Sequence, residues 1–261
     1  WKQWRNSASL LDARERRGAL MSILELSGVT KRYGALIVAD RIDLELADGE
    51  ALGIIGPNGA GKTTLFNLIT GATRADAGTI RFQDQDISFR RANQRCRIGV
   101  SRSFQIPHPF GGMTVFENVL VGAAFGAGLG ERAAYGRVME ILDLAGLADK
   151  ANVVAGSLTL LERKRLEMAR ALATAPKLLL LDEIAGGLTE PECQELVAAI
   201  KVIRSTGISI IWIEHIVHAL IAVVGRLIVI DFGRKIADGD PREVIESPQV
   251  REIYMGIEAD A

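Results

Sequence analysis

A glycine-rich loop that ends in a lysine and two threonines is the first feature of the sequence that could bind a ligand or take part in a reaction. Residues 56–64 read GPNGAGKTT, between an apolar run and apolar residues at helical spacing. Glycines let backbone N–H groups turn toward a phosphate, and the helix N-terminus adds partial positive charge. Lys62 would supply a cation to the β- and γ-phosphates, and Thr63 a hydroxyl ligand to Mg²⁺. A chance glycine-rich turn is the alternative, which the flanking patterns disfavour. The predicted nucleotide-binding residues are Gly56, Asn58, Gly59, Ala60, Gly61, Lys62, Thr63 and Thr64.

Two adjacent acids follow a second apolar run. Residues 177–183 read KLLLLDE, the pattern of a buried strand that ends in Asp182 and Glu183. Beside a phosphate loop, Asp182 would hold Mg²⁺ through water, and Glu183 would orient and polarise an attacking water. The alternative is a buried strand whose end carries two solvated acids. The phosphate loop in the same chain favours the catalytic interpretation.

One of the three histidines stands where a ligand is expected. His215 follows the apolar run Ile208–Ile213, and ligands of doubly wound sheets bind beyond the carboxyl ends of the strands. From there the imidazole can donate a hydrogen bond to the γ-phosphate and hold the water. His108 and His218 have no such support, and we interpret them as structural or surface residues.

A glutamine and a tyrosine are further candidates. Gln105 lies where strand patterns give way to helical ones, and its amide can ligate Mg²⁺ or the water, which predicts a link between the two regions. Tyr33, 29 positions before Lys62, is expected on the loop after the first strand, where it can stack on adenine. A surface tyrosine is the alternative for Tyr33.

The elements that must position these residues can be inferred from periodicity. Apolar and polar residues alternate from Ile23 to Glu50, which predicts half-buried antiparallel strands. Three short and largely apolar runs predict buried strands: Ala51–Ile55, Leu178–Leu181 and Ile208–Ile213. Leu227–Ile230 leads into a predicted hairpin at residues 231–234.

Helical spacing dominates the middle of the chain. Between residues 106 and 175 it appears in Val138–Leu144 and Leu160–Leu172, and it returns in Pro191–Arg204 and Pro241–Met255. We therefore predict a sheet-containing core with antiparallel strands over residues 21–105 and 176–255. A helical subdomain over residues 106–175 is inserted into it.

Residues 1–20 do not begin with Met and lack the apolar core of a signal peptide, whereas Met21 opens a segment that resembles a natural start. We expect a non-native or disordered extension; a short basic helix at a membrane surface is the alternative.

Composition limits the partners. The net charge is −1, with 48% hydrophobic and 24% charged residues, so no basic field favours nucleic acid, and no such partner is expected. No apolar run approaches the roughly 18–20 residues that cross a bilayer. Cys96 and Cys193 match no metal or disulfide pattern.

The order of these motifs resembles that of ABC transporter ATPases: aromatic loop, phosphate loop, Gln loop, signature, paired acids and His. The stretches VSRSFQIPHPFGGMTVFENVLVG, RLEMARALATAPKLLLLDE and DFGRKIADGDPREVIESPQVREIYMG resemble the branched-chain (hydrophobic) amino acid importer subfamily. The resemblance implies an α/β P-loop cassette with a mixed sheet core, which binds ATP and Mg²⁺. Residues 21–105 and 176–255 would be its RecA-like ATP-binding core with the antiparallel β subdomain. Thr63, Gln105 and Asp182 would be the metal ligands, and Glu183, His215 and Lys62 the catalytic residues.

The resemblance also implies partners. Two cassettes would bind two ATP molecules head to tail, as a homodimer or with a second ATPase subunit. They would drive integral membrane permease subunits, fed by an external solute-binding protein. Such a subunit lies peripherally on the cytoplasmic face of the bacterial inner membrane.

The signature departs from the family pattern. Where LSxGQ is usual, residues 158–162 read LTLLE. Thr159 keeps a hydroxyl for the partner's nucleotide, but Leu161 is expected to place a branched side chain where backbone should approach closely. Glu162 adds negative charge, although Thr159 and Glu162 also match a capping box. Ile184 and Thr189 depart from the usual Pro and Asp or Asn. A subfamily variant and a weakened site are both compatible with these changes.

Three functions compete on this evidence. The first is the ATP-hydrolysing subunit of an importer for branched-chain amino acids or similar small amino acid or amide solutes. The second is a non-transport ABC ATPase acting on nucleic acid or the ribosome, or a cassette that hydrolyses weakly and mainly binds ATP. The third, a P-loop kinase or GTPase, would leave Gln105 and His215 unexplained.

Overall fold

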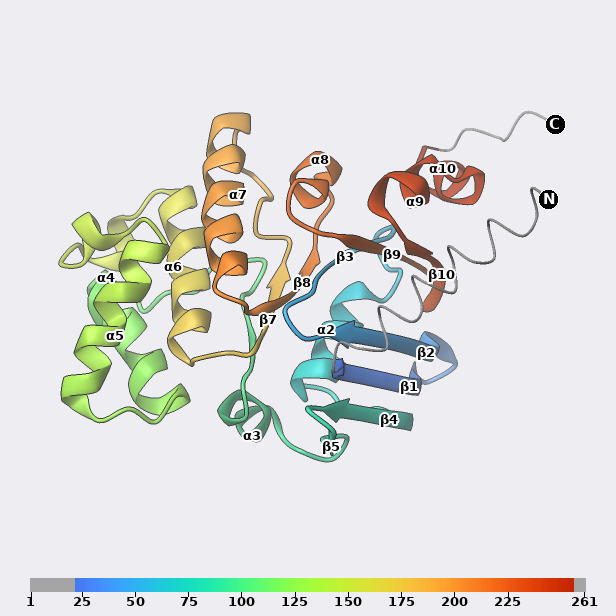
Figure 1. Cartoon of the computed structure of the whole chain (residues 1–261), viewed down its shortest axis with the longest axis horizontal. Coiled ribbons are helices and arrows are strands. Elements are labelled where there is room, and N and C mark those ends of the chain that lie inside the picture. The colour runs from blue at the N-terminus through green and yellow to red at the C-terminus, as the bar shows by residue number, and fades with distance from the viewer. Residues whose placement is uncertain (1–21, 256–261) are drawn as a thin grey trace, which may run out of the picture.

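The computed structural model describes residues 22–255, which form two sheets and a group of helices beside them (Figure 1). Helices α4, α5 and α6 lie together on the left of Figure 1, and the strands occupy its centre and right. The extension predicted for residues 1–20 lies outside the described residues. Within those residues, no helix combines the length and apolar character that a membrane span requires.

The larger sheet has six strands in the order β10-β9-β3-β8-β7-β6, all parallel except β10, which is antiparallel to β9. The predicted buried strands are confirmed as β3, β7 and β8, in which every residue is buried. Parallel strands end at one edge, so the residues that follow these three strands are brought together there. The six strands are β3 (Ala51–Ile55), β6 (Val100–Arg102), β7 (Leu178–Asp182), β8 (Ser209–Ile213), β9 (Arg226–Asp231) and β10 (Arg234–Gly239).

The smaller sheet is antiparallel, in the order β2-β1-β4-β5. Its strands are β1 (Ser22–Tyr33), β2 (Leu36–Ala47), β4 (Ala77–Phe82) and β5 (Gln85–Asp86). The alternation predicted for this region is present: Ile42, Leu44 and Leu46 are buried between exposed neighbours. Tyr33 was expected on a loop, and this is corrected: it is the last residue of β1 and pairs with Leu36 of β2 across a two-residue turn.

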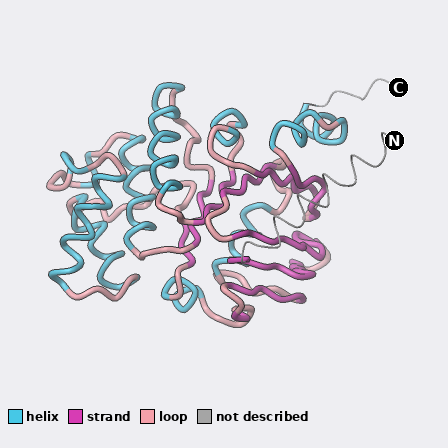
Figure 2. The backbone as a smooth tube through the Cα atoms, viewed as in Figure 1, coloured by secondary structure: helices cyan, strands magenta, loops and turns pink. Residues whose placement is uncertain are grey.

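Most helices lie between β6 and β7 or after β7 in the sequence. Figure 2 shows the helices in cyan and the strands in magenta, with helices grouped on the left. The predicted helices at 138–144, 160–172 and 191–204 are found within longer helices, and the predicted C-terminal helix is divided at Ser247. The helices are α2 (Lys62–Thr70), α3 (Ala92–Arg97), α4 (Val115–Val121), the π-helical η1 (Gly122–Gly126), α5 (Glu131–Leu144), the 3₁₀ turns η2 (Ala148–Lys150) and η3 (Ala155–Ser157), α6 (Leu160–Ala173), α7 (Glu190–Ser205), α8 (Val217–Ile221), α9 (Pro241–Glu246) and α10 (Pro248–Met255).

Two apolar clusters form the core, one on each face of the larger sheet. Leu178 and Leu180 of β7 join the cluster that contains α2 and the smaller sheet, whereas Leu179 and Leu181 join the cluster that contains α4 to α7. This division follows from the period of two along a strand. The larger sheet therefore lies between α2 and the helical region, and both reach the edge where its strands end.

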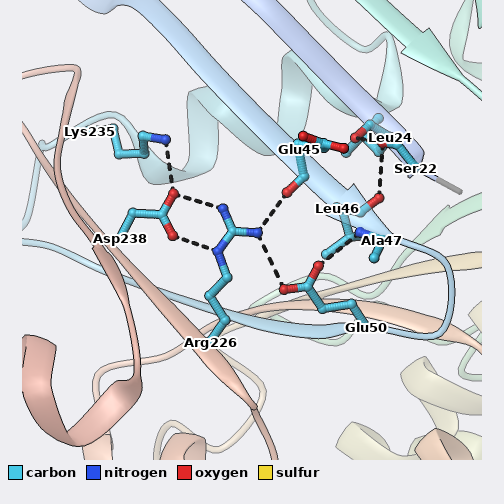
Figure 3. A network of polar contacts seen from close by, with 9 residues as sticks. All are labelled: Ser22, Leu24, Glu45, Leu46, Ala47, Glu50, Arg226, Lys235 and Asp238. Carbon is cyan, nitrogen blue, oxygen red and sulfur yellow. Dashed lines mark hydrogen bonds and ion pairs between the residues drawn. The ribbon is translucent and has the colours of Figure 1, made fainter. Parts of the chain in front are cut away.

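An ion network holds the smaller sheet to the opposite edge of the larger one (Figure 3). Arg226, the first residue of β9, contacts both carboxylate oxygens of Asp238 on β10, at 2.5 and 2.7 Å. It also donates to the backbone oxygen of Glu45 on β2 and to Glu50. Burial alone would raise the pKa of Asp238, but its hydrogen bonds from Arg226 and Lys235 outweigh burial and lower it. Both carboxylate oxygens of Asp238 and both of Glu50 therefore accept hydrogen bonds.

Candidate functional site

The glycine-rich loop joins β3 to α2, as predicted, and its backbone leaves no room for side chains at two glycines. A Cβ atom at Gly56 would lie 2.1 Å from the backbone oxygen of Ile230, and one at Gly61 would lie 2.2 Å from that of Val38. Gly61 also has a φ of 103°. Close packing against β9 and β2 therefore fixes the loop. Of the other predicted loop residues, Asn58, Gly59 and Thr63 are exposed, Thr64 is half-buried and Ala60 is buried.

Lys62, the first residue of α2, bends back over this loop. Its side-chain nitrogen donates to the backbone oxygens of Gly56 and Pro57, at 2.6 and 2.8 Å. Burial lowers the pKa of Lys62, and the negative charges of Glu183 and Asp182 oppose that shift. The ammonium is thus enclosed between the loop and the acid pair.

Glu183 is where the predicted site residues meet. Its Oε2 accepts a hydrogen bond from Nε2 of Gln105 at 2.6 Å, and its Oε1 lies 2.8 Å from Nε2 of His215. Its own backbone is held in the left-handed region, with a φ of 46°, by an N–H bond to the oxygen of Ile213. The side chain of Gln105, which follows β6, and that of His215, which follows β8, therefore converge on the carboxylate that follows β7.

Asp182, the last residue of β7, is 2% exposed. Its Oδ2 is paired with Arg102, while its Oδ1 is buried with no hydrogen-bond partner. Burial raises the pKa of Asp182, and the hydrogen bond from Arg102 opposes this. An unpartnered buried carboxylate oxygen is a donor atom available to a cation.

These residues fit Mg²⁺ better than a metal bound by protein alone. Mg²⁺ takes oxygen ligands and is ordinarily held by one or two carboxylates together with phosphates and water. Asp182 Oδ1, the exposed Thr63 and the Gln105 amide can supply part of such a set. Among residues 22–255, no group of three or more His, Cys, Asp or Glu side chains could hold a metal ion.

Lys164 and Glu214 support the same site and were not predicted. Nζ of Lys164 on α6 donates to the backbone oxygen of Gln105 at 2.8 Å and approaches that of Glu183 at 3.4 Å. Glu214, 1% exposed, accepts from the backbone N–H groups of Ala185 and His215, and burial raises its pKa. Lys164 thus connects the helical region to the Gln105 segment, and Glu214 holds the loops on either side.

The altered signature begins α6 with the predicted capping box. The Thr159 N–H donates to Glu162 Oε2 at 2.8 Å, and the Glu162 N–H donates to the Thr159 hydroxyl. Lys150 lies 3.3 Å from Glu162. The backbone hydrogen bond from Thr159, together with Lys150, lowers the pKa of Glu162. The Glu162 carboxylate is therefore already paired with the Thr159 N–H and with Lys150 of the same chain.

The position expected for Leu161 is corrected by the structure. Its side chain is 8% exposed and belongs to the core, whereas Leu160 is 43% exposed and approaches Gly187 in the loop after the acid pair. The exposed bulk at the start of α6 therefore comes from Leu160. Of the other departures, Ile184 is fully buried and Thr189 caps α7 through Glu192.

The other aromatic and histidine candidates lie in different surroundings. Tyr33 is 52% exposed, and the ammonium of Lys31 lies 5.3 Å from its ring centre. His218 is an exposed residue 3.2 Å from Glu190, and the backbone oxygen of His108 accepts from Arg170. These contacts place Tyr33 on the smaller sheet, outside the contacts made by Glu183, and agree with the interpretation of the two histidines.

A groove of about 320 Å³ separates the core from the helical region. Its lining includes residues of α2, α3, α4, α6 and the Gln105 segment, among them Thr70, Cys96, Phe104, Val121, Glu167 and Arg170. The exposed surface of this lining is largely apolar. It lies directly beside the segment that carries Gln105.

Comparisons with known proteins agree with this geometry. Residues 39–186 match the family model described as ABC transporter, and residues 234–260 match that described as branched-chain amino acid ATP-binding cassette transporter. The chain is 36% identical to the high-affinity branched-chain amino acid transport ATP-binding protein BraF of Pseudomonas aeruginosa, over 90% of this chain and 98% of BraF. The same figures hold for the homologous protein LivG of Escherichia coli. The crystal structure of the ADP conformation of MJ1267, an ATP-binding cassette of an ABC transporter, superposes with a TM-score of 0.83 and 30% identity, over 91% of this chain and all of that one.

Proposed function

This chain belongs to the ABC transporter family of ATP-binding cassettes, and from that premise we propose that it energises the uptake of branched-chain amino acids or similar small amino acid or amide solutes. The predicted family and α/β cassette fold are confirmed, and the chain is an ABC ATPase. The solute class is supported by the subfamily match over residues 234–260 and by the names of BraF and LivG.

One observation carries the proposed mechanism: Gln105 and His215 each contact a different oxygen of Glu183. A carboxylate held in this way can accept a proton from water and orient it for attack on the γ-phosphate. His215 then holds the water and the γ-phosphate oxygen, and Lys62 neutralises charge on the β- and γ-phosphates. Glu183, His215 and Lys62 are thus the proposed catalytic residues.

We assign the cation ligands to Thr63, Gln105 and Asp182. When bound, Mg²⁺ would neutralise charge on the β- and γ-phosphates. Asp182 Oδ1 would hold a water of the cation, because this oxygen is buried and unpartnered. The adenine would stack on Tyr33, and the loop residues 56–64 would surround the phosphates.

The proposed assembly contains two cassettes and a membrane permease. Thr159 is the N-cap of α6, and in this proposal its hydroxyl contacts nucleotide on a second ATPase subunit, identical or different. The apolar groove would receive cytoplasmic helices of the permease, because Phe104 in its lining directly precedes Gln105, which donates to Glu183. An external solute-binding protein would deliver the solute, and the chain would lie at the cytoplasmic face of the inner membrane.

The enzymatic test is Glu183→Gln in the purified protein. Turnover should fall by about 10²–10⁴-fold while ATP affinity stays within a few fold, because the amide cannot take the proton. The matched control is Glu190→Gln, which changes the exposed Glu190–His218 pair instead. Full turnover in Glu183→Gln, or equal losses in both variants, would contradict the assigned role.

The solute class needs a separate experiment. Cells that depend on this chain should lose uptake of radiolabelled leucine when it carries Glu183→Gln, while uptake of an unrelated sugar continues. Leucine uptake that persists at the level of unmodified cells would remove the importer proposal for this solute class and leave the ATPase assignment intact.

A cassette that mainly binds ATP is the second candidate, and the exposed Leu160 favours it. If this side chain obstructs a partner's nucleotide, Leu160→Gly should raise the ATPase rate severalfold. An unchanged rate would identify the signature as a working variant. Leu161→Gly is not the informative change, because it would remove a buried side chain and lower the free energy of unfolding by about 3–4 kcal/mol.

A further inference from the structure

Arg102, the last residue of β6, places its guanidinium against the acid that ends the neighbouring strand. Nη2 donates to Oδ2 of Asp182, in an ion pair whose side chains are 8% and 3% exposed. Nη1 donates to Oδ1 of Asn67 on α2 at 2.6 Å. Nε of Arg102 is buried without a hydrogen-bond partner. The guanidinium is thus held on two sides and incompletely satisfied on a third.

Two aromatic rings enclose the same guanidinium. Its carbon lies 5.5 Å from the ring centre of Phe66 and 5.2 Å from that of Phe104, both within the range of cation–π attraction. Phe66 is fully buried, whereas Phe104 is 53% exposed and belongs to the segment that ends in Gln105. A guanidinium that leaves Asp182 can therefore stay over Phe104 and move toward solvent.

The single negative charge of Asp182 can pair with either of two cations, the guanidinium of Arg102 or a divalent metal ion. One oxygen is occupied by Arg102, and the other is buried and free of protein partners. A divalent cation a few ångströms from a buried guanidinium is strongly repelled, since charges interact more strongly away from water. Full binding of both cations to this carboxylate is therefore unfavourable.

We propose that Arg102 is the resident counter-ion of Asp182 and competes with the divalent cation for that carboxylate. Arrival of the cation weakens the Arg102–Asp182 pair and shifts residues 102–105. Because Gln105 in this segment donates to Glu183, the occupancy of Asp182 is transmitted to the adjacent acid. Arg102 is thus a positioning residue. The inference rests on the proposed role of Asp182 in the cation site.

The test measures the Mg²⁺ dependence of nucleotide binding without turnover. The affinity of the purified chain for a fluorescent ADP analogue is followed while the Mg²⁺ concentration is raised, in the unmodified protein and in Arg102→Met. The Mg²⁺ concentration at half-effect should fall about tenfold in Arg102→Met, equivalent to ~1.4 kcal/mol of removed competition. A midpoint that is unchanged or raised would overturn the proposal.

Two further variants separate this inference from the function on which it rests. Asp182→Asn should remove most of the Mg²⁺ dependence; if it does not, the cation role of Asp182 fails. If Asp182→Asn does remove it but Arg102→Met leaves the midpoint unchanged, only the role of Arg102 fails. Arg226→Met, which breaks the ion pair at the opposite edge of the sheet, should leave the midpoint unchanged and controls for general loosening.

The effect of Arg102→Met on stability can be measured separately from its effect on the Mg²⁺ midpoint. Arg102→Met leaves Asp182 buried and unpaired, so its unfolding midpoint in urea should fall, and the double variant Arg102→Met/Asp182→Asn should recover part of that loss. Arg102→Lys keeps the charge but loses the planar pair of donors. It should give a Mg²⁺ midpoint between those of Arg102→Met and the unmodified protein, and a midpoint at or below that of Arg102→Met would count against competition between charges.

Discussion

At the carboxyl ends of the parallel strands Arg102 meets Asp182, and at the opposite edge of the same sheet Arg226 meets Asp238. Both are arginine–aspartate pairs, with side-chain exposures of 8% and 3% in the first and 13% and 22% in the second. Asp238 receives two hydrogen bonds from Arg226 and one from Lys235, and its pKa is lowered. Asp182 keeps one oxygen without a partner, and its pKa is raised by burial. The fully hydrogen-bonded Asp238 joins strands, whereas the partly hydrogen-bonded Asp182 has an oxygen available to a ligand.

The largest expected effect is on ATP affinity, at the edge of the sheet that contains Asp182. Lys62→Ala should weaken ATP binding by at least about 100-fold, since losing a desolvated charged contact costs about 2–5 kcal/mol and each 1.4 kcal/mol is tenfold. The free energy of unfolding should not fall, because burial of the Lys62 ammonium is itself unfavourable. Titration with a fluorescent ATP analogue and urea unfolding measure the two quantities. Retained affinity would break the comparison.

At the edge that contains Arg226 and Asp238, a substitution should lower the free energy of unfolding and leave ATP affinity nearly unchanged. Arg226→Met leaves Asp238 without its main partner, and the free energy of unfolding should fall by about 2 kcal/mol, less than for a fully buried pair because water reaches Asp238. ATP affinity should remain within about threefold, because the change lies at the edge of the sheet away from the phosphate loop. The same urea and nucleotide titrations decide it. A loss of affinity as large as that in Lys62→Ala would mean that the two ends are coupled.

The smallest expected effect is the pH-dependent contribution of Asp238 to the free energy of unfolding. The lowered pKa of Asp238 means that its ionised form stabilises the fold. This contribution is complete above the unfolded pKa of about 3.9 and is lost as pH falls through the lower folded value. Asp238→Asn should therefore reduce the free energy of unfolding by about 1–2 kcal/mol at pH 7.

The pH series supplies the control for Asp238→Asn. Its difference from the unmodified protein should shrink below about pH 4 and vanish once Asp238 is protonated. Urea unfolding at a series of pH values gives the comparison. A difference that stays constant down to the acid limit would show that the network does not depend on this charge.

Much of the site could be predicted from sequence because it depends on where strands end. Lys62, Asp182, Glu183 and His215 follow apolar runs of strand length, and parallel strands bring such positions to one edge whatever their side-chain conformations. The Thr159–Glu162 capping box could be predicted because it is local. The position of each of these residues along the backbone was sufficient.

What could not be predicted depends on contacts between elements distant in sequence. No local pattern shows that Arg102 on β6 meets an acid on β7, because this requires the order and register of the sheet. For Leu161 a signal was present: Leu161, Lys164 and Met168 fall at helical spacing on one buried face of α6. Alignment with the family signature concealed it.

The close approach of Gly56 to Ile230, and of Gly61 to Val38, has a consequence for the interpretation of random substitutions. In a saturation screen for transport, both glycines would rank as essential alongside Lys62 and Glu183. Their intolerance would nevertheless arise before any nucleotide arrives, because even alanine cannot fit against the backbone of β9 or β2. Variants at Gly56 and Gly61 would be lost from the cell as protein, whereas Lys62 and Glu183 variants would accumulate as folded, inactive subunits. Counting abundance beside growth would separate packing requirements from chemical ones within a single loop.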